Sequence, residues 1–197
     1  MDGSLRLGYL GVMGSQDGVD ILLDGVARLR EIRPNLAVEV DLVGDGEARP
    51  ALERRAAALG ITTRVHFHGY QGPEVFVPLL AATHVCVSPD PPTPFNDVST
   101  MAKVVDYLAI GRPVVAFALT ETVRIVGDAG SIVEVPTADA LAVELAALAD
   151  DPARLAAATA AAGRRIDELD LRWEVSAERL LAAYDSLLAR TGVDEPA

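Results

Sequence analysis

The stretch VSTMAKVVDYLAIGRPVVAF, residues 98–117, joins a helix-like segment directly to a run of β-branched residues. Val104, Val105 and Leu108 can pack on one side of such a helix. Residues 112–117 are an expected strand in which every residue after Arg112 is apolar, which is typical of a strand buried on both faces. A helix that leads into a buried strand is the repeating unit of an α/β fold.

The same alternation continues on both sides of this stretch. Further helical patterns occupy residues 17–32, 46–60, 73–83 and 121–130, and three more, 137–151, 152–169 and 174–190, close the chain. The expected strands are residues 5–13, 37–46, 64–69, 84–89, 112–117 and 131–136. This order predicts a single α/β domain over residues 1–197, with a Rossmann-like doubly wound parallel sheet and extra C-terminal helices. Residues 190–197 are expected to form a frayed tail.

Composition narrows the possible functions. The chain has 197 residues, half of them hydrophobic, so it can bury a substantial core. The net charge of −12 argues against a nucleic-acid-binding surface, and no apolar run approaches the length of about 18 residues that a membrane span needs. Cys86 is the only cysteine and lies in an apolar run, which predicts a buried thiol in a reducing, cytoplasmic setting.

Ligands of doubly wound sheets bind beyond the carboxyl ends of the strands. This rule points to four loops after the first four expected strands: residues 11–18, 44–46, 69–71 and the proline-rich residues 88–99. Gly11, Met13 and Tyr70 are the candidate donor-binding residues in the first and third of these loops. Tyr70 could stack on a nucleotide base or could be an ordinary surface aromatic residue.

The loop of residues 88–99 leads into the helix that holds Lys103, the only lysine among seventeen lysine and arginine residues. We expect Asn96, Asp97 or Ser99 to cap this helix. The unpaired backbone N–H groups that follow would then be available to a phosphate, and they belong to Ser99, Thr100 and Met101.

Ser99, Lys103 and Asp106 are spaced so that they share one face of that helix. A lysine can meet a phosphate as a compact point charge, and a carboxylate can accept hydrogen bonds from the two hydroxyls of a ribose. This layout suits a nucleoside diphosphate. The alternative is a solvated Lys103–Asp106 pair without a ligand.

The pattern Lys-x-x-Asp-Tyr-Leu-Ala-x-Gly-Arg-Pro-Val-Val-Ala, residues 103–116, resembles the donor-site signature of the GT-B retaining glycosyltransferases of family 4, also called group 1. The resemblance extends over nearly the whole chain. It implies a nucleotide-sugar donor such as a UDP- or GDP-sugar, no metal or other cofactor, and transfer of a hexose with retention. It also implies that Asp106 binds the ribose and that Lys103, with the backbone N–H groups before it, stabilises the departing diphosphate.

The chain departs from the family pattern at three positions. The family's arginine after the first-strand glycine and its lysine before the next helix correspond to Val12 and Asp17. The first glutamate of the family's carboxylate pair falls on Val98, where Asn96 or Asp97 could substitute. A subset of the family resembles residues 11–20 and 96–107 more closely, which implies a variant donor site.

The resemblance covers only the C-terminal, donor-binding half of a GT-B enzyme. It implies a partner N-terminal domain that supplies the acceptor site, so we expect no sugar transfer from this half alone. The full enzyme would be cytoplasmic, or peripheral at the membrane. Two alternatives remain: a non-catalytic, truncated or regulatory interaction module, and a different GT-B enzyme such as a sugar-nucleotide epimerase.

Two smaller groups of polar residues have alternative interpretations. Glu121 and Arg124 follow the fifth expected strand; they could close the donor pocket, as in the resembled subset, or form a surface ion pair. His66 and His68 alternate along the third expected strand and therefore point to one face. They suggest either a metal pair or structural histidines, and no third ligand is evident at a useful spacing.

Overall fold

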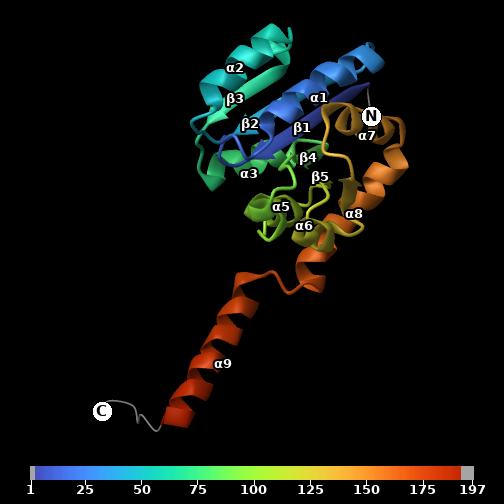
Figure 1. Cartoon of the computed structure of the whole chain (residues 1–197). Helices are drawn as coiled ribbons and strands as arrows, with labels where there is room; N and C mark the ends of the chain where they lie inside the picture. The colour runs from blue at the N-terminus through green and yellow to red at the C-terminus, as the bar shows by residue number, and fades with distance from the viewer. Residues whose placement is uncertain (1–2, 192–197) are drawn as a thin grey trace.

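The computed structural model describes residues 3–191 and shows a six-stranded sheet in which every strand pair is parallel (Figure 1). The strands are β1 (Ser4–Leu10), β2 (Ala37–Val43), β3 (Val65–Gly69), β4 (Val85–Ser88), β5 (Val114–Phe117) and β6 (Gly130–Val133). The predicted doubly wound sheet is confirmed. β1, β2, β4 and β6 end one to three residues earlier than predicted, where loops and turns begin, whereas β3 and β5 end at the predicted residues.

The strand order is β3-β2-β1-β4-β5-β6. β1 therefore lies between β2 and β4. β2 is the next strand in the chain after β1, whereas β4 comes two strands after β2. At such a switch point the connections leave on opposite faces of the sheet, which opens a crevice beyond the strand ends. The order thus places the loops after β1 and β4 on the two sides of one crevice.

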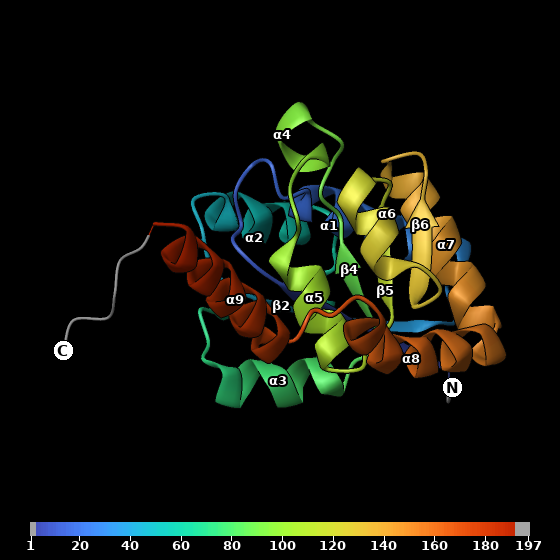
Figure 2. The ribbon, with the colours of Figure 1, turned by 90° about the horizontal axis from the view of Figure 1, so that it is seen from below.

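Helices cover both faces of the sheet (Figures 1 and 2). One face carries α1 (Val19–Ile32), α2 (Arg49–Ala58) and α7 (Ala138–Asp150), and the other carries α3 (Pro73–Ala81), α5 (Ala102–Ala109), α6 (Thr120–Val126) and α8 (Pro152–Glu168). A short 3₁₀ turn, Thr62–Arg64, precedes β3. Each face has its own apolar core. Leu22, Val26 and Leu145 belong to the first core, and Leu108, Ile125 and Ala162 belong to the second.

The helix around Lys103 differs from the prediction. A separate short helix, α4 (Pro94–Asp97), lies in the proline-rich loop, and α5 does not begin until Ala102. Thr93 caps α4 by accepting a hydrogen bond from the Asn96 N–H. Met101 occupies the cap position of α5 and makes no side-chain cap bond. The predicted caps of the lysine helix were therefore wrong, because the side chains of Asn96, Asp97 and Ser99 are bonded elsewhere.

The last helix, α9 (Trp173–Thr191), projects away from the body of the domain (Figure 1). Most of its large apolar residues are more than half exposed to solvent, among them Trp173, Leu181 and Tyr184. Arg190 and Thr191, which were expected in the frayed tail, belong to this helix, and the rest of that prediction, residues 192–197, lies outside the described residues. Within residues 3–191, no helix combines the length and the apolar character that crossing a bilayer requires.

Candidate functional site

The loops after β1 and β2 are held together by backbone hydrogen bonds. The Gly11 N–H donates to the Val43 carbonyl at 3.0 Å, and the Met13 N–H donates to the Asp45 carbonyl at 3.0 Å. A Cβ atom on Gly44, whose φ is 128°, would lie 1.8 Å from the Gly11 carbonyl oxygen. Only glycine permits this close approach, so the two loops form one rigid floor at the strand ends.

The loop after β4 is fastened to the start of α1. A Cβ atom on Gly18, at a φ of 67°, would lie 1.9 Å from the Pro89 carbonyl oxygen, so this position also requires glycine. The buried Asn96 amide donates to the carbonyls of Gln16 at 3.1 Å and Pro91 at 2.9 Å. Asn96 therefore lies at the predicted crevice, where its amide nitrogen ties two loops together.

Lys103 lies beside the loop after β1, next to Gly11. Its Nζ donates to Asp90 Oδ1 at 2.7 Å, lies 3.7 Å from Asp17 Oδ1, and reaches the Tyr9 hydroxyl at 3.5 Å. The lysine side chain is only 10% exposed, and Asp90 is almost completely buried. Lys103 is thus paired with two carboxylates from neighbouring loops. The Lys103–Asp106 pair considered as an alternative is not the arrangement observed.

Two buried phenols stabilise the same region. The Tyr9 hydroxyl donates to the Val12 carbonyl at 2.6 Å, and the Tyr107 hydroxyl accepts from the Leu10 N–H at 2.8 Å. Burial raises the pKa of Tyr9, and the nearby charges of Asp17 and Asp90 raise it further. Burial also raises the pKa of Tyr107 well above its ordinary value. Both phenols therefore stay protonated and serve as fixed polar contacts for the end of β1.

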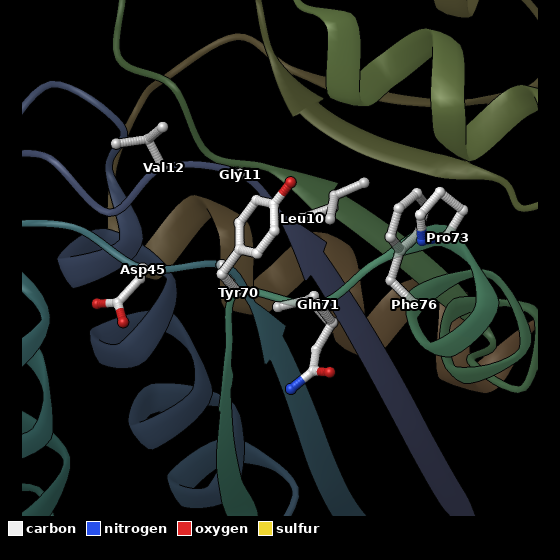
Figure 3. Close-up of a pocket in the computed structure, with 10 residues that line it drawn as sticks. Leu10, Gly11, Val12, Asp45, Tyr70, Gln71, Pro73 and Phe76 are labelled. Carbon is white, nitrogen blue, oxygen red and sulfur yellow. The ribbon is translucent and has the colours of Figure 1, made fainter.

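A pocket of about 350 Å³ opens on the other side of Gly11 (Figure 3). Its apolar walls come from the ends of β1 and β2 and from α3, and Tyr70 and Gln71 come from the loop after β3. The Tyr70 ring is 85% exposed and extends toward Gly11 and Leu10 (Figure 3). The complete lining is Leu10, Gly11, Val12, Val43, Gly44, Asp45, Tyr70, Gln71, Pro73 and Phe76.

The sequence indicated Gly11 and Tyr70 in this pocket, and the predicted loops of residues 44–46 and 69–71 contain Asp45 and Gln71, which also line it. The prediction missed Phe76, which lies in the first turn of α3. The signal was present, because a ligand at a strand end can also reach the start of the helix that follows.

The other predicted donor-site residues do not all face open space. The Met13 side chain is fully buried in the core, so this residue can offer a ligand only its backbone. The Ser99 N–H is bonded to the Asn96 carbonyl at 3.1 Å, and the Ser99 hydroxyl donates to the Phe95 carbonyl at 2.7 Å. The expectation that the Ser99 N–H is available was therefore wrong. Thr100 and Met101 lie in the link directly before α5.

Asp106, on α5, is exposed, and Glu121, on α6, is partly exposed. Partial desolvation raises the pKa of the exposed Asp106 carboxyl. Glu121 Oε2 accepts from Arg124 Nη2 at 2.8 Å, and this hydrogen bond lowers the pKa of Glu121. The predicted ion pair between Glu121 and Arg124 is confirmed.

The two histidines of β3 are bonded to carboxylates of β2. His68 Nε2 lies 2.8 Å from Asp41, and His66 Nε2 lies 3.0 Å from Glu39. Their rings share one face of the sheet, with centroids 6.3 Å apart, as the alternation predicted. In the described part of the chain, no three histidine, cysteine, aspartate or glutamate side chains are grouped so that they could hold a metal ion. The predicted burial of Cys86 is confirmed, and this burial raises the pKa of its thiol to about 12.

The family model of the group 1 glycosyl transferases matches residues 4–151. The chain belongs to this family. Among curated group 1 relatives, a D-inositol 3-phosphate glycosyltransferase from Rhodococcus opacus is 34% identical over 173 residues, which are 84% of this chain and 37% of that protein.

Solved glycosyltransferase structures share the fold. Sucrose-phosphate synthase from Thermosynechococcus elongatus superposes with a TM-score of 0.82 at 23% identity, over 94% of this chain and 46% of that one. Anabaena HepE, solved in complex with UDP, gives a TM-score of 0.71 at 24% identity, over 91% of this chain and 49% of that one. These likenesses confirm the predicted fold, and the family match over residues 4–151 identifies the domain as a group 1 glycosyltransferase domain. This chain spans less than half the length of each of these proteins.

The three positions that depart from the glycosyltransferase pattern have different surroundings in the structure. Val12 and Val98 are exposed, and Val12 lines the pocket. Asp17, in contrast, is part of the bonded network: its Oδ2 accepts from the Gly14 N–H at 2.9 Å. The position where the family pattern has a lysine is thus held by a carboxylate that closes the turn before α1.

Proposed function

We propose that this chain is the donor-binding domain of a retaining, family 4 glycosyltransferase, which binds a nucleotide-diphosphate sugar. One observation carries the proposal. Gly11 separates the pocket from the lysine, because a Cβ atom on Gly11 would lie 3.2 Å from Lys103 Cε while Gly11 itself lines the pocket. A site with an apolar, aromatic-edged pocket beside a cation suits a nucleoside linked to a diphosphate.

The residues of the crevice divide into roles along such a ligand. The nucleotide base would stack on Tyr70 in the pocket, and the Asp106 carboxylate would accept hydrogen bonds from the ribose hydroxyls. The diphosphate would lie toward the start of α5, where Thr100 and Met101 precede the first helical N–H groups. Glu121 and Arg124, on the neighbouring α6, would border the sugar side of the site.

Lys103 would stabilise the charge that develops on the departing diphosphate. A fixed ammonium and oriented backbone N–H groups stabilise such charge without reorganising during the reaction. Asp90 holds the lysine in place and offsets much of its charge, so the backbone N–H groups would supply a larger share of the stabilisation. No step in this scheme requires a metal.

The nucleotide is proposed to be UDP or GDP. The complex of Anabaena HepE with UDP supports a uridine donor, because that structure shares the fold of this chain. The acceptor site is proposed to lie on a second, N-terminal domain, because this chain spans 37% of the length of the Rhodococcus relative. The free, buried thiol of Cys86 supports a reducing, cytoplasmic setting.

The proposal is tested by calorimetric titration of the 197-residue chain with UDP, GDP, ADP and their sugar conjugates. We expect saturable binding of one nucleotide and its sugar conjugate, and loss of that binding in Lys103→Ala. Arg154→Ala is the matched control, because Arg154 is also ion-paired, with Glu144 at 2.6 Å. Circular dichroism of each variant separates lost binding from lost folding. Absence of binding to every nucleotide would contradict the proposal.

A second candidate, a non-catalytic interaction module, is favoured by one observation. Lys103 is already paired with two carboxylates, so the site has no surplus cation for a diphosphate. The same titration separates the two candidates, because a module without a donor site would bind none of the nucleotides.

A further inference from the structure

Asp17 makes the contacts that an oxygen of an external anion would make. Its Oδ2 accepts from the backbone N–H of Gly14 at 2.9 Å, and its Oδ1 lies 3.7 Å from Lys103 Nζ. A backbone N–H in a glycine turn and a lysine ammonium are ordinary partners of bound phosphate. The Asp17 side chain is 15% exposed, so solvent and small solutes can reach it.

The charges around Lys103 do not balance. Asp90 is the inner partner: its side chain is 2% exposed, it receives the short bond from Lys103, and its second oxygen accepts from the Ser88 hydroxyl. One ammonium and one carboxylate cancel, which leaves Asp17 as a surplus negative charge. Within residues 3–191, Lys103 is the only basic side chain within 4.0 Å of either carboxylate.

Two other basic residues near the carboxyl ends of the strands are already in ion pairs. Arg49, at the start of α2, is paired with Asp45 and Glu53, and Arg124 is paired with Glu121. A phosphate that approaches Lys103 therefore meets the Asp17 carboxylate without a compensating free arginine nearby. The repulsion grows with the negative charge of that phosphate.

We propose that Asp17 is a specificity-determining residue that competes with ligand phosphate for Lys103 and the Gly14 N–H, and thereby favours a sugar-capped nucleoside diphosphate over the free nucleoside diphosphate. This inference rests on the proposed function. A terminal phosphate carries a charge of about −1.5 to −2 at neutral pH, whereas a phosphate capped by a sugar keeps about one negative charge. The free nucleotide therefore suffers nearly one additional unit of repulsion from Asp17.

Two consequences follow for a transferase. The sugar-capped donor would bind with less repulsion from Asp17. The nucleotide product would leave readily, because cleavage of the sugar bond increases the negative charge on the terminal phosphate. Asp17 would act in both steps without contacting the sugar.

The test measures the ratio of two dissociation constants, that of the free nucleotide divided by that of its sugar conjugate. The probes are UDP with UDP-glucose, GDP with GDP-mannose, and ADP with ADP-glucose. The variants are Asp17→Asn and Asp17→Ser, whose side-chain oxygens can still accept from the Gly14 N–H. Asp20→Asn is the matched control, since it removes the same charge from the exposed first turn of α1.

We expect the ratio to fall at least about fourfold in both Asp17 variants, which is the factor for one unit charge at roughly 5 Å in a water-like dielectric. The ratio should stay within about twofold of wild type in Asp20→Asn. Binding that appears only when Asp17 is replaced would overturn the inference as well, because the wild-type site would then reject the sugar conjugate together with the free nucleotide. Intact binding with an unchanged ratio would overturn it. If neither wild type nor the Asp17 variants bind any nucleotide, the proposed function fails and the inference fails with it.

Discussion

Lys103 Nζ and Asp90 Oδ1 form a buried ion pair, 2.7 Å apart, at the point where the strand order of the sheet reverses. The pair links the first turn of α5 to the loop after β4. Because Lys103 also reaches Asp17 and the Tyr9 hydroxyl, one side chain connects three segments that border the crevice. The lysine therefore has a structural role, whatever its role toward a ligand.

Replacing Lys103 should destabilise the domain as well as weaken binding. In Lys103→Met the carboxylates of Asp90 and Asp17 lose their cation, and breaking a buried pair from one side costs about 3 kcal/mol or more. We expect the free energy of unfolding to fall by about 3 kcal/mol in urea titrations. The double variant Lys103→Met/Asp90→Asn should recover much of this loss, because the buried charge is also removed. Equal losses in the single and double variants would contradict a coupled pair.

Much of the fold could be predicted because the pattern of apolar residues directly reflects burial. Runs such as Val114–Phe117 are apolar throughout, and this is the signature of strands covered on both faces. The break between α4 and α5 was missed for a physical reason. Helical spacing continues through Ser99, but tertiary hydrogen bonds of Asn96 and Asp97 hold the chain in another path. Such long-range bonds leave no local trace in the sequence.

The candidate site was predicted in part for the same reason. Strand ends can be located from the sequence, so Gly11 and Tyr70 were placed correctly in the loops that line the pocket. The partner of Lys103 could not be found, because Asp90 lies thirteen residues away in an irregular loop. Helical spacing suggested Asp106 instead, and only the packing of α5 against the sheet decides which carboxylate the ammonium reaches.

Tyr107→Phe should loosen the end of β1. The Tyr107 hydroxyl accepts from the Leu10 N–H at 2.8 Å; Tyr107 is fully buried and Leu10 is partly buried. Without the hydroxyl, this N–H loses its partner, which costs about 1 kcal/mol. We expect a loss of that size in urea titrations and faster hydrogen exchange at Leu10. Tyr184→Phe on the exposed α9 is the control and should change neither quantity.

Asp106 should titrate above the ordinary aspartate value of 3.8, because desolvation disfavours its charged form. The folded state then binds the proton more tightly than the unfolded state, so this group favours folding less as the pH rises from 3.8 through its folded pKa. NMR titration of the side-chain carboxyl resonance measures this pKa directly. Glu121 is the internal reference, because its hydrogen bond with Arg124 should shift its pKa below 4.5. A value for Asp106 at or below 3.8 would contradict the desolvation.

Substitutions in α9 should leave the stability of the domain unchanged. Leu181 is exposed on this projecting helix, whereas Leu108 is fully buried between α5 and the sheet. We expect Leu181→Ala to change the free energy of unfolding by less than about 0.5 kcal/mol, whereas Leu108→Ala should lower it by about 2 to 5 kcal/mol. Urea denaturation of both variants makes the comparison. A large loss in Leu181→Ala would mean that α9 packs against a surface in solution, and sedimentation at several protein concentrations would show whether that surface belongs to a second copy of the chain.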